Sequence, residues 1–285
     1  MLRQFAAALT IGVAAFAAAA AAPAPPSPPA PVQFDSADGT RVPALLFLPN
    51  GMPKGSVIAL HGCAGIYAQR GARKGSLSAH YQGVADLLVA QGYAVLFPDS
   101  LGARDVNEIC TERMESRRIG QYARRADALG ALTWLAAQPW AAEGRIALLG
   151  WSHGGSAVLA ATDLARPVVR GTPVRPALAI AFYPGCSAAL FTGYQPSAPL
   201  VLMLAEKDDW AAPGPCVRLG KEAGAEVHVF DDSYHGFDSP VGKVRLRPEI
   251  PNGVNPGQGV HVGPNPVARE QAYARMLALL AHAFR

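Results

Sequence analysis

The chain has 285 residues, of which 50% are hydrophobic and 16% are charged, with a formal net charge of +4 at pH 7. This length and composition fit one α/β domain or two smaller globular domains, and they exclude an intrinsically disordered chain. The nearest approach to a basic stripe is Arg117, Arg118, Arg124 and Arg125 on one predicted helix. We expect these side chains to form a solvated face or a set of salt bridges, so no nucleic-acid partner is expected.

Residues 1–22 have the pattern of a secretory signal peptide. Arg3 gives a positive start, an apolar stretch follows over 5–20, and the alanines of 18–22 offer small-residue cleavage sites. The apolar stretch is too short for a membrane span and leads into prolines, although an uncleaved anchor is the alternative. We therefore expect a secreted or periplasmic protein with no stable membrane insertion after cleavage.

The rest of the chain divides into a short linker and a folded domain. Residues 23–31 are rich in proline and predict an extended linker, so the domain is expected over 32–285. Continuous aliphatic strands that alternate with helices predict a mostly parallel sheet with helices on both faces. Residues 239–264 are rich in Pro and Gly and predict a functional or mobile loop. The predicted strands are 42–48, 56–60, 93–97, 146–149, 177–183, 200–205 and 226–230, and the predicted helices are 78–91, 121–137, 153–164, 217–224 and 265–284.

A G-x-S-x-G pentapeptide, Gly150-Trp151-Ser152-His153-Gly154, lies between a predicted strand and a predicted helix. In a strand–turn–helix context this pattern is typical of a nucleophile elbow. The turn is so tight that a Cβ at either glycine would clash with the strand or the helix. We therefore expect Ser152 to be a nucleophile.

A serine hydroxyl needs a neighbouring base, and the base needs a carboxylate that orients it. Asp208 and Asp209 follow one predicted strand, and His235 follows the next. The carboxyl ends of parallel strands lie along one edge of a sheet, so these groups can converge with Ser152. The order of serine, acid and histidine is that of the α/β-hydrolase fold. Both aspartates remain candidates for the acid, and the spacing to Pro213 slightly favours Asp209.

The oxyanion that forms on the substrate needs two preorganised donors. We expect one to be the backbone N–H of His153, whose ring is not expected to take part. The other is expected from the glycine-rich segment after an early strand, with Cys63 favoured and Ala64 second. None of the histidines has the spacing of metal ligands, so neither a metal nor another cofactor is expected.

Several segments together resemble the dienelactone hydrolase family of α/β-hydrolases. The resemblance implies the α/β-hydrolase fold and a triad of Ser152, Asp208 and His235, with Asp208 at the family's acid position. The namesake enzymes carry a cysteine where this chain has the serine, which favours ordinary ester chemistry. The matching segments are His61–Gly65, Tyr93–Ser100, Gly150–Gly155, Tyr183–Gly185, Asp208–Trp210 and His235–Phe237.

Four cysteines in an exported chain suggest two disulfides, for which three pairings exist. In the strand order that the resemblance implies, the strands before the loops of Cys63 and Cys110 are neighbours. The same holds for the strands before Cys186 and Cys216. We therefore expect the disulfides Cys63–Cys110 and Cys186–Cys216. Four buried free thiols are the alternative.

The sequence thus predicts an exported serine hydrolase that cleaves a carboxylic ester or lactone through an acyl-enzyme. Tyr183, Trp151, Trp210 and Phe237 are candidates for the wall of the substrate pocket, although core packing explains Trp151 equally well. An amidase or exopeptidase, a polyester depolymerase and a non-catalytic binding protein are alternatives on the same fold. The expected partner is a small-molecule ester or lactone, and the sequence leaves the acyl group, the alcohol and the oligomeric state open.

Overall fold

The computed structural model describes residue 1 and residues 28–285. Almost all of the expected signal peptide and most of the expected linker therefore lie outside the described residues. The first strand, β1 (Ala30–Asp35), begins two residues before the expected start of the domain, because it pairs antiparallel with the next strand. No helix in the described part of the chain is long and apolar enough to cross a bilayer.

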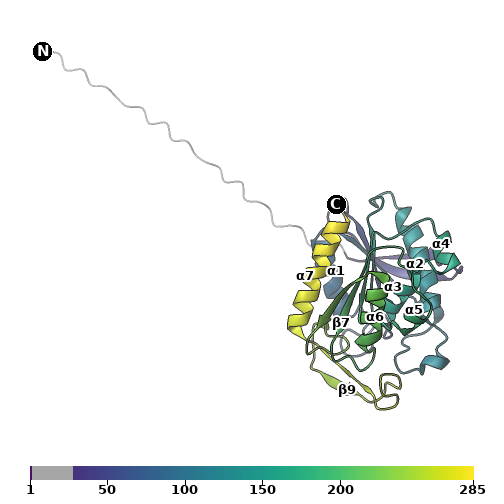
Figure 1. Ribbon diagram of the computed structural model, residues 1–285. Helices are drawn as coiled ribbons and strands as arrows, with labels where there is room; N and C mark the ends of the chain where they lie inside the picture. Colours follow the sequence, from purple (N-terminus) through teal and green to yellow (C-terminus); the bar gives the residue numbers. More distant parts are fainter. Residues whose placement is uncertain (2–27) are drawn as a thin grey trace.

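The centre of the molecule is an eight-stranded sheet with the order β1-β2-β4-β3-β5-β6-β7-β8 (Figure 1). β1 and β2 run antiparallel to their neighbours, and the strands from β4 to β8 are parallel to one another. The chain therefore has the predicted mostly parallel α/β-hydrolase sheet. The further strands are β2 (Arg41–Phe47), β3 (Ser56–Leu60), β4 (Ala94–Pro98), β5 (Ile146–Trp151), β6 (Leu178–Phe182), β7 (Leu200–Ala205) and β8 (Glu226–Phe230).

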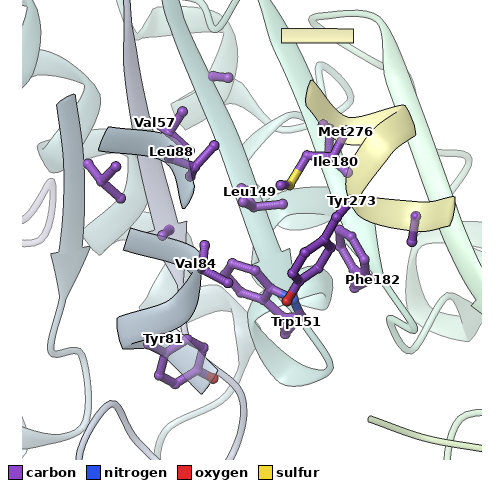
Figure 2. Close-up of a cluster of buried hydrophobic side chains, with 14 of the residues drawn as sticks. Val57, Tyr81, Val84, Leu88, Leu149, Trp151, Ile180, Phe182, Tyr273 and Met276 are labelled. Atoms are coloured by element: carbon purple, nitrogen blue, oxygen red, sulfur yellow. The ribbon is translucent and has the colours of Figure 1, made fainter. Parts of the chain in front are cut away.

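Helices cover both faces of this sheet (Figure 1). α1 and α7 pack on one face through an apolar cluster that Figure 2 shows, with Val84 and Leu88 from α1 and Met276 from α7. α2, α3 and α6 pack on the other face through a second cluster. These long helices are α1 (Ala79–Ala90), α2 (Gln121–Ala136), α3 (His153–Ala161), α6 (Pro213–Ala223) and α7 (Pro266–Ala283).

Four short helical turns were not predicted from the sequence. They are η1 (Gly102–Arg104), η2 (Met114–Ser116), α4 (Pro167–Gly171) and α5 (Ser187–Phe191). The segment 239–264 also has more structure than the predicted loop. It contains β9 (Arg245–Arg247) and β10 (Val260–Val262), which pair antiparallel with each other.

The predicted basic helix face is wrong. α2 begins at Gln121, so Arg117 and Arg118 precede the helix. Arg124 is fully buried rather than solvated. Its guanidinium lies against the first turn of α3, with Nη1 3.0 Å from Nδ1 of His153. An arginine on an amphipathic helix is normally assigned to the solvent side, and only the packing of α2 against α3 shows otherwise.

Candidate active site

Ser152 lies in a strained turn between β5 and α3. Its backbone φ is 53° and its ψ is −120°, a conformation that L-residues rarely adopt. A Cβ added at Gly154 would collide with the carbonyl oxygen of Leu60, and one at Gly150 would collide with the carbonyl oxygen of Gly154. Both glycines are therefore required for the turn that exposes the serine hydroxyl.

Ser152, His235 and Asp208 form one chain of hydrogen bonds. Nε2 of His235 lies 2.8 Å from Oγ of Ser152, and Nδ1 lies 2.8 Å from Oδ2 of Asp208. An ionised carboxylate only accepts, so Nδ1 of His235 is the donor in this pair and Nε2 is left to accept the serine proton. His235 and Asp208 are both buried. The geometry is that of a nucleophile, a base and an orienting acid.

The structure separates the two adjacent aspartates. Oδ1 of Asp208 accepts hydrogen bonds from the backbone N–H groups of Trp210, at 2.9 Å, and Ala211, at 2.8 Å, so the carboxylate is fixed in the plane that faces the histidine. Asp209 contacts His261 of β10 instead, with Oδ2 2.7 Å from Nδ1 and with Oδ1 accepting from the backbone N–H at 2.8 Å. Asp209 therefore ties β10 to the loop after β7.

A cavity of about 500 Å³ opens at Ser152 and His235. Trp210 is the one predicted aromatic that lines it, with its ring centroid 4.7 Å from that of His235. The residues that line the cavity come from the η2–α2 segment, the elbow, the loops after β3, β6, β7 and β8, and the 239–264 segment. They are Cys63, Met114, Arg117, Gly120, Gln121, Tyr122, Ser152, His153, Ser156, Gly185, Cys186, Ser187, Ala188, Trp210, Ala211, Ala212, Pro215, His235, Gly253 and Val254.

Three residues predicted for the pocket wall do not line the cavity. Trp151, Tyr183 and Phe237 are buried in the apolar cluster beneath α1 and α7. Trp151 is the last residue of β5 and directly precedes the nucleophile, so its side chain points to the opposite side, into the core. Tyr183 is close to the site without facing the cavity, since its ring centroid is 4.6 Å from that of His235.

The η2–α2 segment forms one wall of the cavity, and this wall was not predicted from the sequence. Arg117 is half-buried there, and its Nε and Nη2 atoms are buried without a hydrogen-bond partner among the described residues. Met114, Tyr122 and Val254 are exposed at the same cavity. This wall therefore combines one cationic group with an apolar rim.

The two residues predicted for the oxyanion hole both line the cavity beside the serine. Cys63 lies there after β3, and His153 is the first residue of α3. Within the part of the chain that the structure describes, neither backbone N–H donates to another protein group. Ala64, the second candidate, does not line the cavity. The arrangement leaves the N–H groups of Cys63 and His153 available to a bound ligand.

All four cysteines are in disulfides with the expected pairing. Cys63–Cys110 and Cys186–Cys216 each join Cα atoms that lie 5.0 Å apart. One cysteine of each pair lines the cavity. Cys186–Cys216 connects the loop after β6 to α6, which follows the loop of the two aspartates.

Asp238 is a buried carboxylate that sequence reasoning did not single out. It is fully buried and accepts hydrogen bonds from the hydroxyl of Tyr183 at 2.6 Å, Nε1 of Trp151 at 2.8 Å and the hydroxyl of Tyr273 at 3.1 Å. Nε2 of His80 lies 3.0 Å from Oδ2. Burial alone would raise the pKa of this carboxyl, but His80 and the hydrogen bonds lower it. Figure 2 shows Trp151 and Tyr273 meeting at this point from β5 and α7.

No group of three or more histidine, cysteine or acidic side chains in the described part of the chain is arranged to hold a metal ion.

Comparisons with known proteins agree with this fold. The chain resembles a dienelactone hydrolase-like promiscuous phosphotriesterase from metagenomic libraries, with 17% identity, 90% of this chain and 99% of that chain covered, and a TM-score of 0.65. It resembles a putative dienelactone hydrolase from Klebsiella pneumoniae subsp. pneumoniae with 17% identity, 88% and 99% coverage, and a TM-score of 0.61. It also resembles 36% of a dipeptidyl peptidase 4 from Porphyromonas gingivalis, with 16% identity, 90% of this chain covered and a TM-score of 0.60.

At these identities the structural likeness shows the fold alone. No curated protein matches the chain. The family model of the dienelactone hydrolase family matches residues 42–284, which is nearly the whole of the described domain. The chain therefore belongs to the dienelactone hydrolase family.

Proposed function

We propose that the protein is an exported serine hydrolase that cleaves a carboxylic ester or lactone through an acyl-enzyme intermediate. The observation that carries the proposal is the hydrogen-bonded chain from Ser152 through His235 to Asp208 at the mouth of a cavity. A binding protein has no need for this chain, since each of its members is arranged for proton transfer rather than for contact.

In the proposed mechanism, Oγ of Ser152 attacks the acyl carbon while Nε2 of His235 takes its proton. Asp208 holds Nδ1–H of the base and stabilises the imidazolium that forms. The N–H groups of Cys63 and His153 bind the oxyanion of the tetrahedral intermediate. His235 then gives its proton to the leaving alkoxide. A water molecule cleaves the acyl-enzyme by the same steps, and the serine regains its proton.

The nature of the nucleophile and of the cavity favours a small ester over the alternatives. His235 can return its proton to an alkoxide or to an amine, so the triad alone serves esters and amides alike. We place the ester or lactone first because the serine stands where the family's namesake enzymes carry a cysteine, which favours ordinary ester chemistry. A cavity of about 500 Å³ fits a small molecule rather than a polymer chain. We therefore place the amidase and the polyester depolymerase second.

Export is supported by two features. The N-terminal residues have the pattern of a signal peptide, and both disulfides need an oxidising compartment to form and persist. We propose that residues 1–22 are removed and that the mature protein consists of the proline-rich linker and the domain. Mass analysis of protein recovered from the periplasm or the medium tests this, and a full-length chain in the cytoplasm would contradict it.

A panel of nitrophenyl esters of increasing acyl length, run beside a lactone and an amino-acyl nitroanilide, tests the reaction class. We expect hydrolysis of the short esters or the lactone, and turnover of the anilide lower by orders of magnitude. Preferential cleavage of the anilide would make the protein an amidase. Hydrolysis of no substrate, together with no labelling by a fluorophosphonate, would make it a binding protein.

A further inference from the structure

The imidazole of His153 is held by a buried arginine. Nη1 of Arg124 lies 3.0 Å from Nδ1 of the ring, and Arg124 is fully buried. A guanidinium only donates hydrogen bonds, so Nδ1 of His153 is the acceptor and carries no proton. The single proton of the neutral ring is then on Nε2.

The surroundings of this ring keep it neutral. Burial lowers the pKa of His153 well below 6.5, and the charges of Arg124 and Arg117 lower it further. Burial also lowers the pKa of Arg124, to about 10, so the guanidinium is still charged at neutral pH. The ring is therefore an uncharged N–H donor beside a cation.

Nε2 of His153 is open to the cavity. Among the described residues this nitrogen has no hydrogen-bond partner. It is not fully buried, so a ligand can reach it. Nε2 of His61, in contrast, is fully buried and unpartnered. His153 lines the cavity together with Ser152 and Arg117, so its free N–H opens onto the space that a substrate fills.

The positions of Arg124 and His235 in the fold indicate which part of the substrate the His153 ring meets. Arg124 lies on α2, which packs on β1, β3 and β5. His235 follows β8, at the opposite end of the sheet. The leaving group must lie beside His235 to receive its proton, so the α2 side of Ser152 is left for the acyl group.

We infer that His153 is a specificity-determining residue whose Nε2–H donates a hydrogen bond to an acceptor oxygen in the acyl group of the substrate. Arg124 is a positioning residue that fixes the tautomer of the ring. The inference rests on the proposed ester hydrolysis and adds to it a substrate class: esters with an oxygen atom along the acyl chain.

Pairs of nitrophenyl esters that differ by one oxygen test this contact. Methoxyacetate replaces one methylene of butyrate with an ether oxygen, and 3-methoxypropionate does the same for valerate. His153→Phe removes the donor, whereas His153→Gln keeps an N–H donor on a side chain of similar reach. The ratio of wild-type to variant kcat/KM cancels the difference in chemical reactivity between the two esters of a pair.

We expect His153→Phe to lower kcat/KM about tenfold more for at least one oxygenated ester than for its alkyl partner, because the bound ether oxygen is then left without a donor. His153→Gln should recover part of this difference. Equal losses within both pairs would mean that the ring only packs against the substrate, and this result would overturn the inference.

A spectrum of the protein labelled with ¹⁵N-histidine tests the tautomer without any turnover. We expect His153 to be neutral and protonated at Nε2 at neutral pH, because burial and the neighbouring arginines lower its pKa. In Arg124→Met the ring should lose this preference and titrate closer to its ordinary range. A ring of the wild-type protein that is charged at neutral pH, or protonated at Nδ1, would overturn the inference even if esters are hydrolysed. Conversely, a wild-type protein with the expected tautomer and no esterase activity would count against the proposed function.

Discussion

The adjacent aspartates allow a matched pair of substitutions, Asp208→Asn and Asp209→Asn. In the structure, Oδ1 of Asp208 accepts two backbone N–H groups and Oδ2 accepts Nδ1–H of His235. Backbone N–H groups only donate, so an asparagine at this position must keep its carbonyl oxygen at the Oδ1 site. Its NH₂ group then faces the histidine and forces Nδ1 to accept.

The consequence for catalysis follows from the tautomer. With Nδ1 unprotonated, the ring carries its proton on Nε2, which is 2.8 Å from Oγ of Ser152 and can no longer accept from it. Asp208→Asn should therefore lower kcat by up to about 10⁴. Asp209→Asn changes the contact to His261 of β10 and should cost less than about tenfold, because no hydrogen bond of the base changes.

Initial rates with one good nitrophenyl ester, measured for both variants at the same pH, decide between these expectations. Circular dichroism and the urea midpoint of each variant control for loss of the fold. Equal losses of kcat in the two variants, or the larger loss at Asp209, would refute the assignment of the acid.

Three further predictions concern the surroundings of the site. Arg117→Gln should raise KM about tenfold for an anionic ester such as nitrophenyl hemiglutarate and less for the butyrate, since the substitution removes a positive charge from the cavity wall. Equal effects would contradict a role in charge recognition. Asp238→Asn should lower the free energy of unfolding by on the order of 3 kcal/mol, because it turns one acceptor of a fully buried network into a donor. Urea titrations measure this, and a change below about 1 kcal/mol would contradict the expected cost. In non-reducing peptide maps of the exported protein, Cys186 and Cys216 should appear in one linked pair that resists alkylation until a reductant is added, and free alkylation of both would exclude the disulfide.

The main sheet could be predicted because its strands carry the signal in their own residues. β3, β4, β5, β6 and β7 are buried at every position, so each reads as a continuous aliphatic run. β1 could not be predicted in the same way. Most of its residues are exposed or half-buried and it contains Pro31, so its sequence resembles the linker from which it continues.

The candidate triad was predictable to different degrees. Ser152 is marked by its glycines and His235 by its place after the last strand of the sheet. Spacing alone could not separate Asp208 from Asp209, because adjacent residues in a turn differ in direction rather than in position. The separation rests on two backbone N–H groups and on His261, which comes from a distant segment.

The buried polar groups were beyond sequence reasoning. Asp238 is satisfied by side chains from α1, β5, α7 and the residue after β6, which meet only when the sheet is formed. Arg124 is buried because α3 covers it, and nothing in the pattern of α2 marks it. The sequence also could not show which tryptophan lines the cavity. Trp151 packs in the core and Trp210 faces the cavity, and only the folded structure determines this.

The central claim is that Ser152 is the nucleophile, and the most direct measurement is the site of labelling by a fluorophosphonate. We expect the wild-type protein to gain one phosphonyl group, located on Ser152 by peptide mass spectrometry, in step with the loss of esterase activity. Ser152→Ala should fold with the same disulfides, should not be labelled, and should lose several orders of magnitude in kcat. Hydrolysis at the wild-type rate by Ser152→Ala, or labelling of the wild-type protein at another residue, would contradict the proposed mechanism.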